Sequence, residues 1–193
     1  DADGDGVSEA QQVLADDVPG GAPTALRRAG DLLLVTGQGS VKPIVIYRLG
    51  AAPADELTQV GTIDLNYSST WRHPHSALGV RPTPGQPGSY DLVFQLGSVS
   101  NFERTTATGT LTSTIGLSGD LNPDAIHMLT ITDSGTEVTG SNLIQLATGL
   151  RNPAGFAFHP ETGDLYFEDN GIDGLVNVDE PTSDDELNVI SFD

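Results

Sequence analysis

The sequence predicts an all-β chain, on three observations. Glycine and proline, with 23 and 12 residues, together exceed a sixth of the 193 residues. Amphipathic helix periodicity is scarce, and short β-rich runs alternate with turn clusters throughout the chain. The clearest turn clusters lie at residues 18–21, 82–85 and 160–163.

The expected strands follow one another along the chain, each bounded by turn residues. They rest on runs of β-branched, aromatic and aliphatic side chains four to eight residues long. Only residues 9–15 suggest a short helix or turn. The expected strands are residues 31–36, 43–49, 90–96, 106–113, 126–132, 155–158, 165–168 and 187–192.

Three of these segments repeat one pattern, in which a polar turn leads into a strand that ends on glycine. The repeats end at Gly37, Gly97 and Gly171, which are 60 and 74 residues apart. A further β segment follows each repeat. This recurrence favours a β-propeller over a sandwich, because a propeller is built from similar four-stranded blades joined by loops. We therefore expect residues 1–193 to form a single partial β-propeller domain of about three blades.

A closed propeller has roughly four to eight blades, so the remaining blades are expected from further sequence or from another chain.

The formal net charge of −19, with one lysine and seven arginines, disfavours nucleic acid and anionic membranes as partners. No stretch is apolar enough for membrane insertion. The chain contains no cysteine, which excludes disulfides and thiolate chemistry. It begins without a signal peptide, which suggests a processed or excised N-terminus. The acidic composition favours an extracytoplasmic location, periplasmic or secreted.

An acidic loop at residues 1–12 has the spacing of a calcium-binding loop. Carboxylates alternate and a glycine stands at the sixth position, where a sharp turn is needed. The position that normally carries a glutamate, the twelfth, is Gln12. A solvated acidic turn is the alternative interpretation. The candidate calcium ligands of this loop are Asp1, Asp3, Asp5 and Glu9.

Three sub-motifs stand in one order between residues 149 and 188. The first contains Arg151-Asn152-Pro153, the second Asp169-Asn170-Gly171, and the third Asp184-Asp185-Glu186-Leu187-Asn188. This order resembles the glucose/sorbosone dehydrogenase family, soluble quinoproteins that oxidise sugars on a β-propeller with pyrroloquinoline quinone (PQQ) and calcium. The resemblance weakens outside this window, and it implies a propeller of six blades.

The resemblance also implies roles for individual residues. Arg151 and Asn152 would contact the quinone, where an arginine stabilises developing negative charge. His75 would be the base that takes a proton from the sugar hydroxyl, with His73 as the fallback. The implied calcium ligands are the carbonyls of Gly171 and Ile172 and the carboxylates of Asp185 and Glu186.

Each of these residues also has a structural interpretation. Arg151 could pair with a carboxylate, Asn152-Pro153 could only set a turn, and His75 could be a hydrogen-bonded loop residue. The acidic run near Asp185 could be a solvated loop. Gly97 is followed by Ser98, where the family usually has an aspartate.

Two functions follow as expectations. One is a PQQ- and calcium-dependent sugar or aldose dehydrogenase. The other is a non-catalytic, calcium-stabilised extracellular propeller that acts as a binding or surface module. Dinucleotide, phosphate-loop, serine-hydrolase and zinc motifs are not found in the sequence, which disfavours those classes of enzyme.

Overall fold

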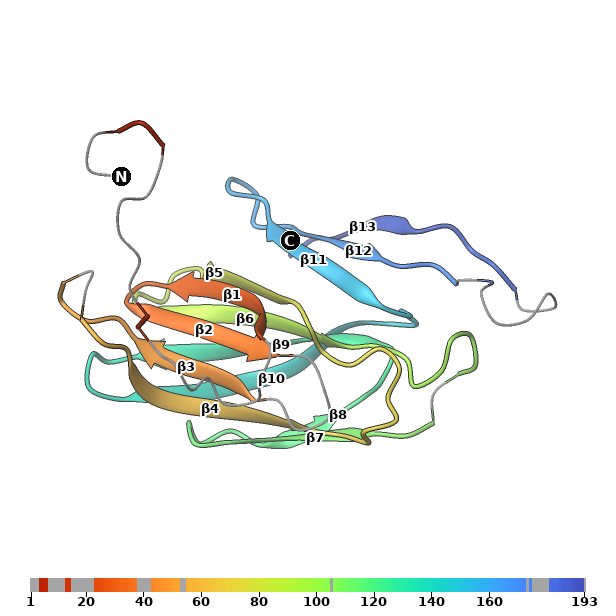
Figure 1. The fold of residues 1–193 in the computed structure, drawn as a ribbon, viewed down its shortest axis with the longest axis horizontal. Coiled ribbons are helices and arrows are strands. Elements are labelled where there is room, and N and C mark those ends of the chain that lie inside the picture. The colour runs from red at the N-terminus through yellow and green to blue at the C-terminus, as the bar shows by residue number, and fades with distance from the viewer. Residues whose placement is uncertain are drawn as a thin grey trace.

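The prediction of an all-β chain is confirmed, and the strands form three antiparallel sheets, none of them closed (Figure 1). The computed structural model describes residues 4–6, 13–14, 23–37, 43–52, 55–104, 106–172, 174 and 181–192. Within these residues there is no helix. The expected helix or turn at 9–15 lies mostly outside them, and residues 13 and 14 are not helical.

The first sheet is a four-stranded meander extended by a hairpin. Its strand order is β1-β2-β3-β4-β7-β8. The hairpin of the last two strands follows β6 (Ser89–Leu96) in the sequence but pairs with β4 of the first sheet. The strands are β1 (Pro23–Ala29), β2 (Leu32–Gly37), β3 (Ile44–Arg48), β4 (Thr58–Asn66), β7 (Gly109–Ser113) and β8 (Gly119–Leu121).

The second and third sheets are also antiparallel meanders. The second has the order β10-β9-β6-β5, and the third has the order β11-β12-β13. The second sheet contains β5 (Leu78–Pro82), β6 (Ser89–Leu96), β9 (Ala125–Asp133) and β10 (Val138–Thr148). The third contains β11 (Pro153–Phe158), β12 (Leu165–Asp169) and β13 (Glu186–Ile190).

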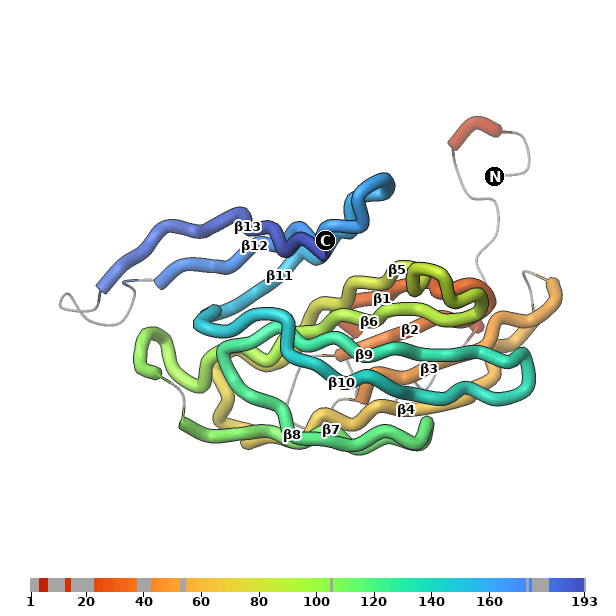
Figure 2. Tube along the Cα trace, turned by 180° about the vertical axis from the view of Figure 1, so that it is seen from behind, coloured from red at the N-terminus to blue at the C-terminus, as the bar shows by residue number. Residues whose placement is uncertain are grey.

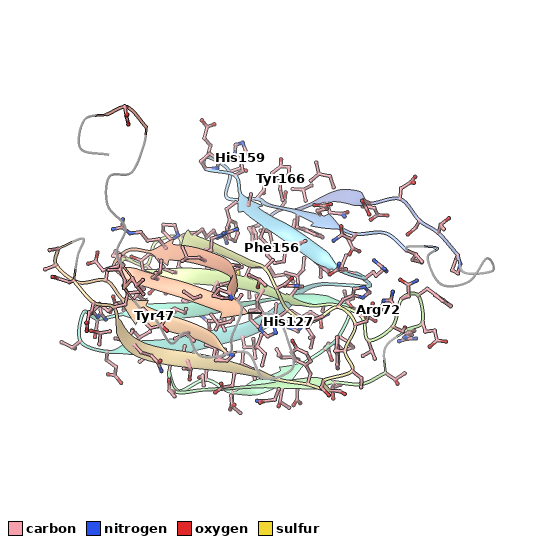
Figure 3. All side chains as sticks on the ribbon, viewed as in Figure 1. Tyr47, Arg72, His127, Phe156, His159 and Tyr166 are labelled. Carbon is pink, nitrogen blue, oxygen red and sulfur yellow. The ribbon has the colours of Figure 1, made fainter. Side chains whose placement is uncertain are left out.

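The second sheet packs between the other two, which explains its nearly continuous apolar strands. On β6, Leu92, Phe94 and Leu96 face the first sheet, and Val93 faces the third. Phe156 of β11 belongs to the second of these cores, and Figure 3 shows it between the third sheet and the strands below. The alternation of side chains along one strand therefore supplies two cores at once.

The repeat found in the sequence corresponds to equivalent strands. Its three copies form β2, β6 and β12, the second strand of each sheet, and the segments that follow them form β3, β9 and β13, the third strand. The larger glycine spacing after Gly97 is explained by the inserted β7–β8 hairpin. The first strands also adjoin one another, because β5 contacts both β1 and β11 (Figure 2).

Candidate functional site

The three sub-motifs meet at one end of the third sheet. Asp169 lies at the end of β12, and its carboxylate accepts the backbone N–H groups of Arg151 at 3.1 Å and of Asn152 at 2.7 Å. Asn170 donates from its side chain to the Asn152 carbonyl at 3.1 Å. Asp169 is also the register partner of Glu186 on β13. The pairing of β11, β12 and β13 is therefore what brings the predicted residues together.

The turn before β11 positions Arg151. Gly149 has a φ of +84°, a conformation that favours glycine, and it follows the last residue of β10. The Asp169 carboxylate then holds the next backbone N–H groups in place. Burial raises the pKa of Asp169, while the hydrogen bonds from Asn152 and Arg151 oppose that shift and the nearby Glu186 charge adds to it.

The side chain of Arg151 crosses to a loop of the second sheet. We call residues 98–104, which follow β6, the Phe102 loop. The guanidinium donates from Nε to the Asn101 carbonyl at 2.8 Å and from Nη2 to the Asn101 side-chain oxygen. It also donates from Nη1 to the Asn170 carbonyl at 3.1 Å. These three acceptors fix the plane of the guanidinium.

Arg151 and the Phe102 loop border a cavity of about 320 Å³, the Arg151 cavity. The Phe102 ring is 47% exposed, and Leu150 and Ile172 add apolar surface to the cavity wall. Its charged groups are two guanidinium groups and two carboxylates. The lining residues are Ser98, Asn101, Phe102, Glu103, Arg104, Asp124, Gly149, Leu150, Arg151 and Ile172.

The two candidate histidines differ in their relation to this cavity. His75 is fully buried, and its Nδ1 lies 2.6 Å from the hydroxyl of Tyr67. Burial raises the pKa of the Tyr67 hydroxyl far above its ordinary value, so this hydroxyl stays protonated and can donate to Nδ1. His73 instead has its Nδ1 2.8 Å from the hydroxyl of Ser98, which lines the Arg151 cavity.

Ser98 connects the fallback histidine to the arginine. Its backbone N–H donates to the Arg151 carbonyl at 2.8 Å, and its hydroxyl donates to the Ser100 carbonyl at 2.6 Å. The position that carries an aspartate in the resembled family is therefore occupied by a hydroxyl held between His73 and the Phe102 loop.

At the second predicted calcium site, hydrogen bonds join residues 171 and 172 to residues 183 and 185. Gly171 N–H donates to the Asp185 carboxylate at 2.8 Å, and the Ile172 carbonyl accepts from Ser183 N–H at 3.3 Å. The Glu186 carboxylate accepts a 3.4 Å hydrogen bond from the Asn188 side chain. No group of three or more histidine, cysteine, aspartate or glutamate side chains suited to a metal occurs among the described residues.

Most of the first predicted calcium site lies outside the described residues. Asp1, Asp3 and Glu9 are not described, whereas Asp5 is exposed. Gly6 has a φ of +86°, so the turn expected at the sixth position is present.

Several residues of the site were not predicted from the sequence. Asn101, Phe102 and Arg104 belong to the Phe102 loop, and Arg72 and Tyr67 lie in the segment between β4 and β5. One local pattern could have indicated the Phe102 loop: Phe102 stands between an amide and a charged side chain, soon after the strand-ending Gly97. Loops of this kind carry function more often than strands do.

Comparisons with known proteins add little to this geometry. The chain matches no protein-family model, and it matches no solved structure. It is 50% identical over 46 residues, 24% of its length, to an uncharacterized protein of Borreliella burgdorferi. The match spans only 11% of that protein's length, too little to assign a family. No helix among the described residues is long and apolar enough to cross a membrane.

Proposed function

We propose that this chain is part of a six-bladed β-propeller of the glucose/sorbosone dehydrogenase type, which oxidises a sugar hydroxyl with PQQ and calcium outside the cytoplasm. The observation that carries the proposal is the meeting of the three sub-motifs, which sets the Arg151 guanidinium at the wall of a cavity. The equivalent second strands and the adjoining first strands support the propeller. The blades that complete it would come from further sequence or another chain.

The Arg151 cavity has the types of side chain that a planar anionic ring system such as PQQ requires, namely cationic donors and apolar surface. Arg104 and Arg151 can donate to its oxygens, and Phe102 and Leu150 offer apolar surface to its faces. When bound there, PQQ supplies an acceptor for the hydride that leaves the sugar. Arg151 would hold a quinone oxygen with its fixed guanidinium, which costs no reorganisation as negative charge develops. Asn152 does not line this cavity and acts through the turn that it shares with Arg151.

The calcium part of the proposal is supported less by the described residues. One Asp185 oxygen and the Ile172 carbonyl already accept backbone hydrogen bonds, so these groups do not make up a calcium shell by themselves. The proposed contribution of calcium is a counter-charge for the acidic loops at residues 1–12 and 171–186.

A dehydrogenase needs a base that removes the proton of the sugar hydroxyl, and the position of this base separates the catalytic from the non-catalytic function. His75 needs access to the sugar hydroxyl, yet its ring is fully buried beside Tyr67. His73 is nearer to the Arg151 cavity through Ser98. The burial of His75 favours the alternative function, a non-catalytic, calcium-stabilised extracellular propeller that acts as a binding or surface module.

The test measures PQQ binding and sugar-dependent dye reduction with calcium present. Arg151→Ala should abolish most binding or slow reduction about a hundredfold, equal to a loss of about 3 kcal/mol of transition-state stabilisation. Arg28→Gln is the matched control, because Arg28 is exposed and donates only to the nearby Gly30 carbonyl among the described residues.

The histidines are tested in the same assay. His75→Ala should abolish dye reduction if His75 is the base. Full activity of that variant together with loss in His73→Ala would move the base to His73. PQQ binding without any dye reduction, in the wild type, would favour the non-catalytic module, and absence of PQQ binding would refute the dehydrogenase proposal.

A further inference from the structure

Two of the seven arginines differ from the others in their surroundings. Arg27 and Arg28 donate to backbone carbonyls, and Arg48, Arg81 and Arg151 are bonded to side chains or carbonyls elsewhere in the fold. In the part of the chain that the structure describes, the side chains of Arg72 and Arg104 make no hydrogen bond or ion pair. Both line cavities that border the Phe102 loop. Both side chains are exposed, and in a protein with a net charge of −19 they form a local positive patch beside the Phe102 loop that can attract an anion.

Arg72 borders a second, more open cavity of about 530 Å³, the Arg72 cavity. Its wall is shared with the Arg151 cavity through residues Asn101, Phe102 and Glu103. Thr70, Val99 and Ser100 complete its lining. Figure 3 shows Arg72 at the end of the sheets where the loop after β6 projects.

The wall of the Arg72 cavity is formed before any ligand arrives. The Arg72 backbone N–H donates to the Val99 carbonyl at 3.1 Å. The Ser100 hydroxyl donates to the Glu103 carbonyl at 2.9 Å and accepts the Glu103 N–H at 3.0 Å, which closes a tight turn. Arg151 holds Asn101 from the other side. Binding a small ligand would therefore require the Arg72 and Phe102 side chains to become ordered, but not the loop backbone.

The chemistry of this wall combines a charge, an apolar ring and a hydroxyl. A guanidinium binds a carboxylate through two parallel hydrogen bonds. The half-exposed Phe102 ring can cover the apolar face of a sugar ring, and the exposed Thr70 hydroxyl can bond a sugar hydroxyl. The Glu103 carboxylate on the same wall repels an anion, and the positive charge of Arg72 offsets this repulsion.

We infer that the Arg72 cavity binds a sugar that carries a carboxylate, such as a uronate, with Arg72 on the carboxylate and Phe102 against the ring. This inference deepens the proposed function, on which it rests for the choice of a sugar. It assigns the substrate class as acidic rather than neutral sugars.

Binding of glucuronate, with glucose as the neutral comparison, tests this inference by calorimetry or by chemical-shift changes on the whole chain without PQQ. Glucuronate should bind more tightly than glucose, and its affinity should fall as salt rises. Arg72→Gln should weaken glucuronate binding by about two- to fivefold, the loss expected for an ion pair at an exposed side chain. Arg28→Gln should leave it unchanged. Glu103→Gln should strengthen it by removing repulsion.

Three results would overturn the inference: equal affinity for glucose and glucuronate, unchanged binding in Arg72→Gln, or no glucuronate binding by the folded wild type. Circular dichroism of each variant shows whether it is folded. Because no PQQ is present, failure here is distinct from failure of the dehydrogenase proposal, which is read from PQQ binding at Arg151.

Discussion

Arg81 of β5 and Asp91 of β6 form an ion pair across the second sheet, with 2.9 Å between Nε and Oδ2. Their side chains are only 12% and 5% exposed. The same guanidinium donates to the Gly163 carbonyl in the turn between β11 and β12, and it lies 4.0 Å from the ring centre of Phe192. One side chain thus satisfies a buried carboxylate and ties the second sheet to the third.

Arg81→Leu should lower the free energy of unfolding by about 3 to 5 kcal/mol, because the buried Asp91 carboxylate loses its cationic partner and keeps only the hydrogen bond from the Thr83 hydroxyl. Thermal or denaturant unfolding of the variant measures this loss. The double variant Arg81→Leu/Asp91→Leu should recover part of it. Equal losses in the single and double variants would show that the contacts with Gly163 and Phe192, rather than the ion pair, carry the effect.

We expect His127 to make the stability of the folded chain depend on pH. Its buried ring stacks on Phe94 with 5.5 Å between ring centres, and Nε2 lies 2.9 Å from the Asn122 carbonyl. Burial lowers the pKa of His127 below its ordinary value, and the hydrogen bond to Asn122 offsets this in part. The folded state therefore binds fewer protons than the unfolded state below pH 6.5, the ordinary pKa of histidine.

We expect stability to be constant with respect to His127 above about pH 6.5 and to fall as the pH drops below that value. Unfolding midpoints measured from pH 7.5 to 5 provide the test. In His127→Gln the decline over this range should become shallower. His159→Gln is the control, because His159 lies at the turn after β11 with its ring only partly buried. An unchanged slope in His127→Gln would mean that other groups cause the decline.

The sequence predicted the repeat and every central strand except β4, and it missed the edge strands β1, β5, β8 and β10. Strands β6 and β9 are buried on both faces, so their long apolar runs are easily recognised. Strand β10 is mostly exposed and has two register irregularities, which break the alternation that identifies a strand. Strand β1 carries two arginines and is mostly exposed. Pairing with a neighbour, which cannot be read from local residues, determines these strands.

The candidate site was predictable only where its residues are near one another in sequence or in strand register. Arg151, Asn152 and Asp169 come together through the β11–β12 pairing. The contact of Arg151 with Asn101 joins residues fifty positions apart, and no local pattern indicates it. The burial of His75 likewise depends on Tyr67, which the sequence alone did not single out.

The third sheet ends on β13, whose outer edge has no partner strand among the described residues. Leu187 and Val189 on this strand are 81% and 53% exposed. An exposed apolar edge strand promotes pairing with another strand. We expect the chain alone to self-associate at high concentration, as measured by sedimentation velocity.

Leu187→Lys should reduce this association by placing a charge on the edge. Tyr166→Lys, on the central strand β12 of the same sheet, is the control for an exposed apolar side chain away from an edge, since Tyr166 is 40% exposed. Equal reduction in both variants would point to general hydrophobic association, and a wild type that stays monomeric would contradict the prediction.

Calcium should stabilise the folded chain, because the protein carries a net charge of −19 and acidic loops at residues 1–12 and 171–186. A cation that binds only the folded state raises its stability by mass action, about 2.7 kcal/mol at a hundred times the dissociation constant. Melting curves with calcium and with chelator, at matched ionic strength, measure the effect. Magnesium at the same concentration controls for screening, because it resists losing its water ligands. Asp185→Asn should reduce the calcium-dependent shift if the second loop binds the ion, and identical midpoints with calcium and chelator would remove both sites from the proposed function.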